Sequence, residues 1–109
     1  MIDWTQVKSL RDDVGAEEFE EIVDIFLEEV EEVIGKLRKT PDINSLENDM
    51  HFLKGSAMNL GFYEFSQMCL QGEKLSANGN ATEVDLPKIL TCFDASKTTF
   101  MKDVSSAIQ

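Results

Sequence analysis

The segment AEEFEEIVDIFLEEVEEVIGKLR, residues 16–38, decides the fold class of this chain. Its apolar residues recur at steps of three and four, which places them along one side of an α-helix. This apolar stripe comprises Phe19, Ile22, Val23, Phe26, Val30, Val33, Ile34 and Leu37. Because such a stripe must be covered to be stable, the segment predicts a domain built from packed helices.

Apolar residues recur with the same period on either side of this segment. A short helix is predicted from about residue 4 to 13, and it ends near a glycine. Further helices are predicted over residues 43–60 and 62–77, and a last one begins between residues 83 and 87 with a proline in its first turn. We therefore expect an all-α fold, an antiparallel four-helix bundle with an additional short N-terminal helix that caps one end.

Length and composition bound the class of protein. A chain of 109 residues forms one hydrophobic core, so we expect a single domain over residues 1–109. The formal net charge of −11 disfavours nucleic acid and acidic lipid as partners, because both bind lysine and arginine. Neither a signal peptide nor an apolar run of the roughly 20 residues that span a bilayer is visible. We expect a cytoplasmic protein with no membrane contact.

Two cysteines and one histidine are the only soft metal ligands in the chain. Cys69 and Cys92 lie in separate predicted helices without CxxC spacing, and four such ligands for structural zinc cannot be assembled. We expect no metal site, and we expect both cysteines to be buried as small hydrophobic residues.

The single histidine, His51, lies in the middle of the helix predicted over residues 43–60. Met50 and Leu53 belong to the apolar stripe of that helix, and each residue turns the helix by about 100°. His51 therefore falls on a neighbouring face that is mainly polar and that also carries Asn48. We expect its imidazole to reach solvent.

Lys54 and Gly55 follow His51 by three and four residues, so both lie beside it on the helix surface. A lysine there can neutralise negative charge on a phosphate. Glycine costs about 1 kcal/mol relative to alanine inside a helix, and its missing side chain would leave room for another protein to approach. The glycine can instead bend the helix or let a neighbouring helix pack closely. Spacing alone favours a reactive histidine no more than an ordinary surface one.

The string HFLKGSAMNLG, residues 51–61, resembles the signature of the histidine-containing phosphotransfer (Hpt) family, approximately H-x-L-K-G-[SA]-[SA]-x-x-[LIV]-G. Eight of its eleven positions match, namely His51, Leu53, Lys54, Gly55, Ser56, Ala57, Leu60 and Gly61. The family fold is a four-helix bundle with an additional short N-terminal helix, so the resemblance extends to the organisation of the whole chain.

The resemblance implies roles for four residues. His51 would accept a phosphoryl group on a ring nitrogen, usually Nε2, with Lys54 beside that group and Gly55 keeping the approach open. The family places a Gln or Glu 22 residues after the histidine, and Glu73 stands there. A carboxylate that accepts a hydrogen bond from Nδ1–H would fix the tautomer and leave Nε2 nucleophilic.

The surface around His51 would receive the partner protein. Some family members have a polar residue 19 positions after the histidine, but this chain has Leu70 there, so a polar role at that position is absent. We expect Asn48, Met58 and Leu70 to contribute to partner binding. Met58 and Leu70 can equally be partly buried packing residues.

The implied function is to relay a phosphoryl group through His51 to and from aspartates of response-regulator receiver domains, with a hybrid histidine kinase as a further candidate partner. The chain has no GxGxxG or Walker-type loop and no evident acidic cluster for magnesium, so we expect no autonomous kinase activity and no bound cofactor. The receiver would supply Mg²⁺. We expect a monomer. Two alternatives stay open: a non-phosphorylated helical adaptor, and the N-terminal Hpt domain of a larger hybrid or chemotaxis-type kinase.

Overall fold

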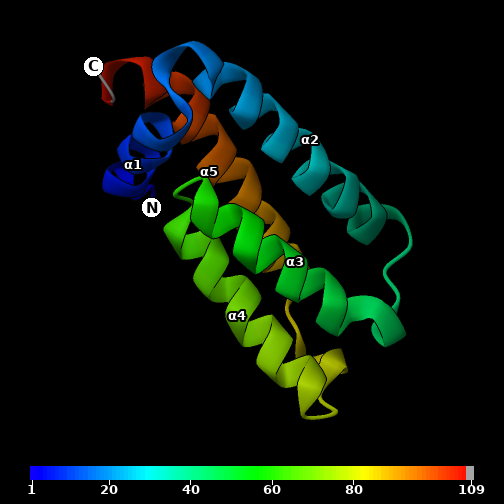
Figure 1. The fold of residues 1–109 in the computed structure, drawn as a ribbon. Helices are drawn as coiled ribbons and strands as arrows, with labels where there is room; N and C mark the ends of the chain where they lie inside the picture. The colour runs from blue at the N-terminus through cyan, green and yellow to red at the C-terminus, as the bar shows by residue number, and fades with distance from the viewer. Residues whose placement is uncertain (108–109) are drawn as a thin grey trace.

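The computed structural model describes residues 1–107, and this part of the chain consists of helices joined by short loops, without a β-strand. Its helices are α1 (Trp4–Val14), α2 (Ala16–Lys39), α3 (Leu46–Asn59), α4 (Tyr63–Ala77) and α5 (Leu86–Ala107), as Figure 1 shows. Single 3-10 turns at Ile43–Ser45 and Ala81–Glu83 precede α3 and α5. The predicted all-α fold is confirmed.

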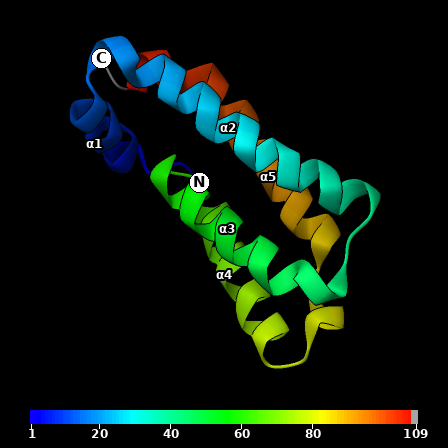
Figure 2. The same cartoon turned by 45° about the vertical axis from the view of Figure 1, so that its right-hand side comes forward.

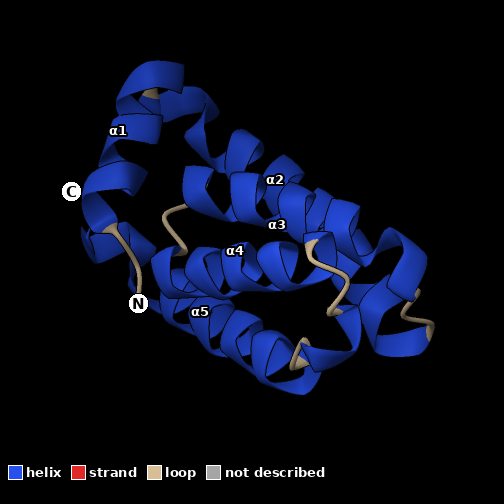
Figure 3. Ribbon diagram, turned by 90° about the horizontal axis from the view of Figure 1, so that it is seen from below, coloured by secondary structure: helices blue, strands red, loops and turns tan. Residues whose placement is uncertain are grey.

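The four long helices form the predicted antiparallel bundle. Helix α3 packs against α4 on one side and α2 on the other, and α5 completes the bundle by contacting both α4 and α2. The short helix α1 lies at the end of the bundle where α2 begins and α5 ends (Figures 1 and 2). Short loops connect the helices (Figure 3), so that neighbours in sequence are mostly neighbours in space.

Aromatic side chains join the helices in the core. The ring of Phe93 lies 5.4 Å from that of Phe65 and 6.2 Å from that of Phe62, which in turn lies 5.4 Å from Phe100. Trp4 of α1 stacks on Phe100 at 5.9 Å. Offset and tilted contacts of this kind stabilise a core beyond the area they bury. The stacking contact attaches the capping helix α1 to the bundle.

Gly61 makes the tight turn between α3 and α4. Its φ of +77° lies in the left-handed region, where glycine is favoured. Its carbonyl accepts a hydrogen bond of 2.7 Å from the backbone N–H of Asp3, and a Cβ atom at this position would lie 2.7 Å from the Asp3 carbonyl oxygen and from Val7. The turn therefore also holds the N-terminal segment against the bundle.

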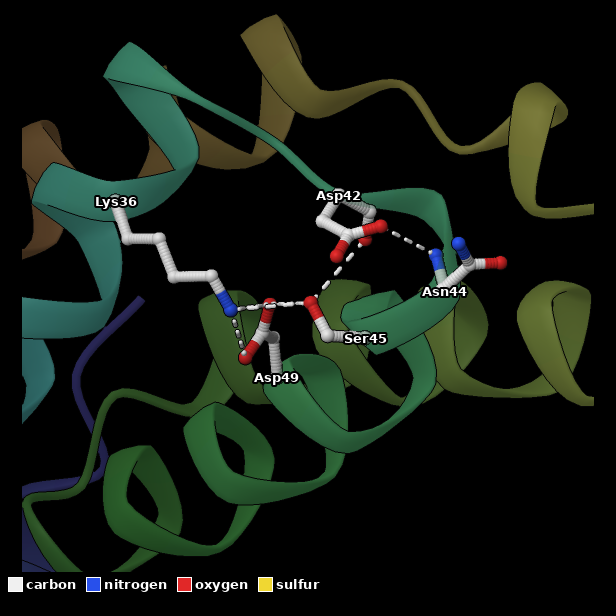
Figure 4. Close-up of polar contacts among 5 residues, drawn as sticks. All are labelled: Lys36, Asp42, Asn44, Ser45 and Asp49. Atoms are coloured by element: carbon white, nitrogen blue, oxygen red, sulfur yellow. Dashed lines mark hydrogen bonds and ion pairs between the residues drawn. The ribbon is translucent and has the colours of Figure 1, made fainter.

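The loop between α2 and α3 is closed by polar contacts (Figure 4). The Asp42 side chain accepts a hydrogen bond of 2.9 Å from the backbone N–H of Asn44, which starts the 3-10 turn. Lys36, near the end of α2, donates to the Ser45 hydroxyl and to the Asp49 carboxylate, both at 3.0 Å. The helix predicted from residue 43 is therefore wrong at its start, because this cap favours a 3-10 turn and α3 begins at residue 46.

Burial corrects two further expectations. Cys69 is fully buried as expected, but Cys92 is only half-buried, because it lines an open groove between α4 and α5. The apolar stripe of α2 is also wider than the contact that covers it. Its members Ile22, Phe26 and Val33 are only half-buried, and of these Phe26 and Val33 pack against the edge of the core.

Candidate functional site

His51 lies on the outer surface of α3, and its side chain is 69% exposed. Met50 and Leu53, its neighbours on the apolar stripe, are fully buried. These two residues fix the rotation of α3 about its own axis, and the 100° step then directs His51 outward. The expectation that the imidazole reaches solvent is confirmed.

Glu73 reaches His51 from the adjacent helix α4. Its Oε2 atom lies 2.6 Å from Nδ1 of His51, and its side chain is only 19% exposed. An ionised carboxylate can only accept a hydrogen bond, so Nδ1 carries the proton and donates it. In the neutral imidazole the lone pair then resides on Nε2, the nitrogen that forms no hydrogen bond with another described residue.

Lys54 binds the other oxygen of the same carboxylate. Its Nζ atom donates to Oε1 of Glu73 at 2.6 Å. This hydrogen bond is the main cause that lowers the pKa of Glu73, and the bond from His51 adds to the effect. Glu73 is therefore ionised at neutral pH, and it links the histidine and the lysine into one network. Sequence reasoning placed Lys54 beside His51 but missed its ion pair with Glu73.

Gly55 and Gly72 leave out a side chain for different reasons. A Cβ atom on Gly55 would meet nothing within 4 Å, which excludes close helix packing as its purpose. Close packing occurs instead at Gly72, where a Cβ atom would lie 2.8 Å from Sδ of Met50. This close approach of α4 to α3 occurs one residue before Glu73 and brings its carboxylate within reach of His51. Gly72 stands inside the helix predicted over residues 62–77, and a glycine there is a signal of close helix packing that sequence reasoning did not use.

Within residues 1–107 no group of three or more histidine, cysteine, aspartate or glutamate side chains is arranged to hold a metal ion. No helix in this range combines the length and the apolar character that crossing a bilayer requires.

A family model described as the Hpt domain matches residues 21–99, which is more than half of the chain and includes the His51–Lys54–Glu73 network. The chain belongs to the Hpt domain family. No curated protein and no solved structure matches it significantly. Hpt domains are phosphocarrier modules of two-component signalling rather than kinases, and they interact in general with receiver domains of response regulators.

The predicted partner-binding residues of this Hpt domain lie in separate places. Asn48 is exposed and lines a groove between α2 and α3. Met58 is 54% exposed and lines a small pocket of about 110 Å³ together with Tyr63 at the α1 end of the bundle. Leu70 is half-buried on α4. The three residues therefore do not share one cavity.

Phe52 is a surface residue of the Hpt domain that sequence reasoning missed. Its side chain is 37% exposed and lines the same groove as Asn48. The signal was present, because Phe52 follows His51 directly and stands outside the apolar stripe of α3. A large aromatic residue outside that stripe cannot be fully buried in the core.

Proposed function

We propose that this protein carries a phosphoryl group on Nε2 of His51 and exchanges it with aspartates of response-regulator receiver domains in a multistep phosphorelay. The observation that carries the proposal is the 2.6 Å contact between Glu73 and Nδ1 of His51. It holds the proton on Nδ1 and leaves the lone pair on Nε2, which is the atom that must attack phosphorus.

The transfer step balances without a proton leaving the ring. The Nε2 lone pair attacks the phosphorus of the receiver's aspartyl phosphate in line, so that the N–P bond forms as the O–P bond to aspartate breaks. The aspartate leaves as a carboxylate. The imidazole, which keeps its proton on Nδ1, becomes cationic, and the Glu73 carboxylate at 2.6 Å offsets that charge. The same contacts serve the reverse direction.

Lys54 and Gly55 supply charge and access in this proposal. The Nζ atom of Lys54 is held next to the imidazole through their shared carboxylate, and an ammonium group has three N–H donors, so it can also bind a phosphoryl oxygen. Gly55 leaves open space one turn along the exposed surface. We expect Gly55→Glu to fold and to lose transfer, because its side chain occupies the approach. A normal transfer rate in that variant would remove the access role.

In this proposal the receiver supplies the remaining groups of the reaction. It would bring the aspartyl phosphate, Mg²⁺ and most of the positioning of the reacting groups. We also propose that the carrier is a cytoplasmic monomer and that its domain spans residues 1–109. Sedimentation equilibrium on the purified chain measures its mass in solution and so tests whether it is a monomer.

The deciding experiment uses receiver domains purified from the source organism and charged with acetyl phosphate and Mg²⁺. Each is mixed with this protein or with His51→Gln, and circular dichroism checks that the variant remains helical. We expect rapid labelling that requires His51 and that is labile to acid but stable to base. Labelling of His51→Gln, or no labelling by any receiver, would overturn the proposal, and the second result would favour the adaptor alternative.

A further inference from the structure

A groove of about 490 Å³ runs between α2 and α3, beside His51. Its lining consists of Glu29, Glu32, Val33, Lys36, Asn48, Asp49 and Phe52. We propose that a receiver domain docks over this groove, and that Glu29 and Glu32 select receivers that present lysine or arginine beside an apolar patch. The inference rests on the proposed function and adds to it the chemistry of the partner.

The position of the groove relative to His51 carries the first step. Lys54 and Glu73 occupy the side of His51 that faces α4. The hydrogen bonds of Glu73 with Lys54 and with His51 close that side to a partner protein. Asn48 and Phe52 lie on the opposite side, three residues before and one residue after the histidine, and both line the groove. A protein that approaches the free Nε2 atom therefore has its open contact surface over α2 and α3.

The groove also offers an apolar anchor. Phe52 is 37% exposed, and Val33 across from it on α2 is half-buried. Ile25, exposed on α2, lies one turn before Glu29 and extends the apolar surface along that helix. Interface cores are enriched in aromatic residues and ringed by polar groups, and this arrangement has both features.

Charge determines which partner fits. Lys36 is the one basic residue of the groove lining, and Asp49 and Ser45 already bind its Nζ atom at 3.0 Å (Figure 4). Glu29 and Glu32 form no hydrogen bond or ion pair with another described side chain, whereas Glu31 between them pairs with Lys97 of α5. The groove therefore presents two unpaired carboxylates, and complementary charge across an interface favours a basic partner.

The charge requirement is tested with Glu29→Lys and Glu32→Lys, and Glu20→Lys is the matched control. Glu20 is exposed on the same helix but lies nine residues before Glu29, which places it on the opposite side of α2. It lines a pocket against α5 rather than the groove, and it gives the same change of net charge. The initial rate of phosphoryl transfer is measured against the concentration of the receiver domain that labels wild type fastest. We expect the groove variants to raise KM, the receiver concentration that gives half the maximal transfer rate, roughly three- to tenfold, with little change in the maximal rate itself. This rise in KM should be smaller at about 0.5 M salt, which screens the charges. A similar KM in all three variants would overturn the selection by charge.

The apolar anchor is tested with Phe52→Ala, and Met101→Ala is its control because Met101 is exposed on the distant helix α5. We expect Phe52→Ala to raise KM at low and high salt alike, and Met101→Ala to leave it unchanged. A larger rise in Met58→Ala than in Phe52→Ala would place docking nearer α1 and overturn the groove. If wild type itself is never labelled, the proposed function fails; if it is labelled and the groove variants match their controls, only the docking groove fails.

Discussion

Oε2 of Glu73 lies 2.6 Å from Nδ1 of His51, although the two residues are 22 positions apart and stand on different helices. The partly buried carboxylate thereby decides which nitrogen of an exposed imidazole is free to react. Since Lys54 binds the second oxygen of that carboxylate, the orientation of the ring and the position of the cation depend on one side chain.

Removing the acceptor should change the tautomer of His51. In Glu73→Ala nothing holds the proton on Nδ1, so we expect the Nε2–H form to become populated and phosphoryl transfer to fall by about tenfold or more. Glu73→Gln is the control, because its amide oxygen can still accept from Nδ1–H. Nitrogen NMR of the imidazole reports the tautomer, and transfer from a charged receiver reports the rate. An unchanged tautomer in Glu73→Ala would contradict the orienting role.

The pKa of Glu73 should depend on Lys54. The hydrogen bond from Lys54 lowers this pKa, so the carboxyl carbon should titrate by NMR at a midpoint below the usual value of about 4.3. The stabilisation from this network is then fully present above the unfolded-state pKa and is lost as pH falls through the lower folded-state pKa. In Lys54→Gln the midpoint should rise. A midpoint that stays in place would show that Lys54 does not hold the carboxylate in solution.

Two glycines of the Hpt signature should respond in opposite ways to alanine. Gly55 is helical with open space around it, so Gly55→Ala should raise the free energy of unfolding by about 1 kcal/mol. Gly61 has a positive φ and a backbone oxygen 2.7 Å from the added Cβ, so Gly61→Ala should lower it by more than about 1 kcal/mol. Urea unfolding followed by circular dichroism measures both changes. Equal effects of one sign would contradict this assignment.

The two thiols should differ in reactivity. Burial raises the pKa of Cys69 to about 12, and burial also raises that of Cys92, which is only half-buried. At about pH 8 we expect a slow reaction of Cys92 with a thiol reagent in the native protein and almost none of Cys69, because the thiolate is the nucleophile. Mass spectrometry identifies the modified residue, and denaturant should expose both. Faster labelling of Cys69 than of Cys92 in the native state would contradict the packing of α4 against α5.

Much of the candidate site follows from the sequence, because relations within one helix depend only on its period. Met50 and Leu53 fix the buried face of α3, and the exposure of His51 and its proximity to Lys54 and Gly55 follow from the 100° step. The family signature alone singled out Glu73. Without it, a lone glutamate on α4 reads as a solvated acid.

Relations between helices were decided only by the tertiary structure, because they depend on how each helix is rotated and shifted against its neighbour. The packing of Gly72 on Met50 sets that register for α3 and α4, and it brings Glu73 to both His51 and Lys54. The approach of α2 to α3 likewise creates the groove at Phe52. The sequence by itself determined the helices, the bundle and the exposed histidine, whereas side-chain packing between helices determined which residues meet it.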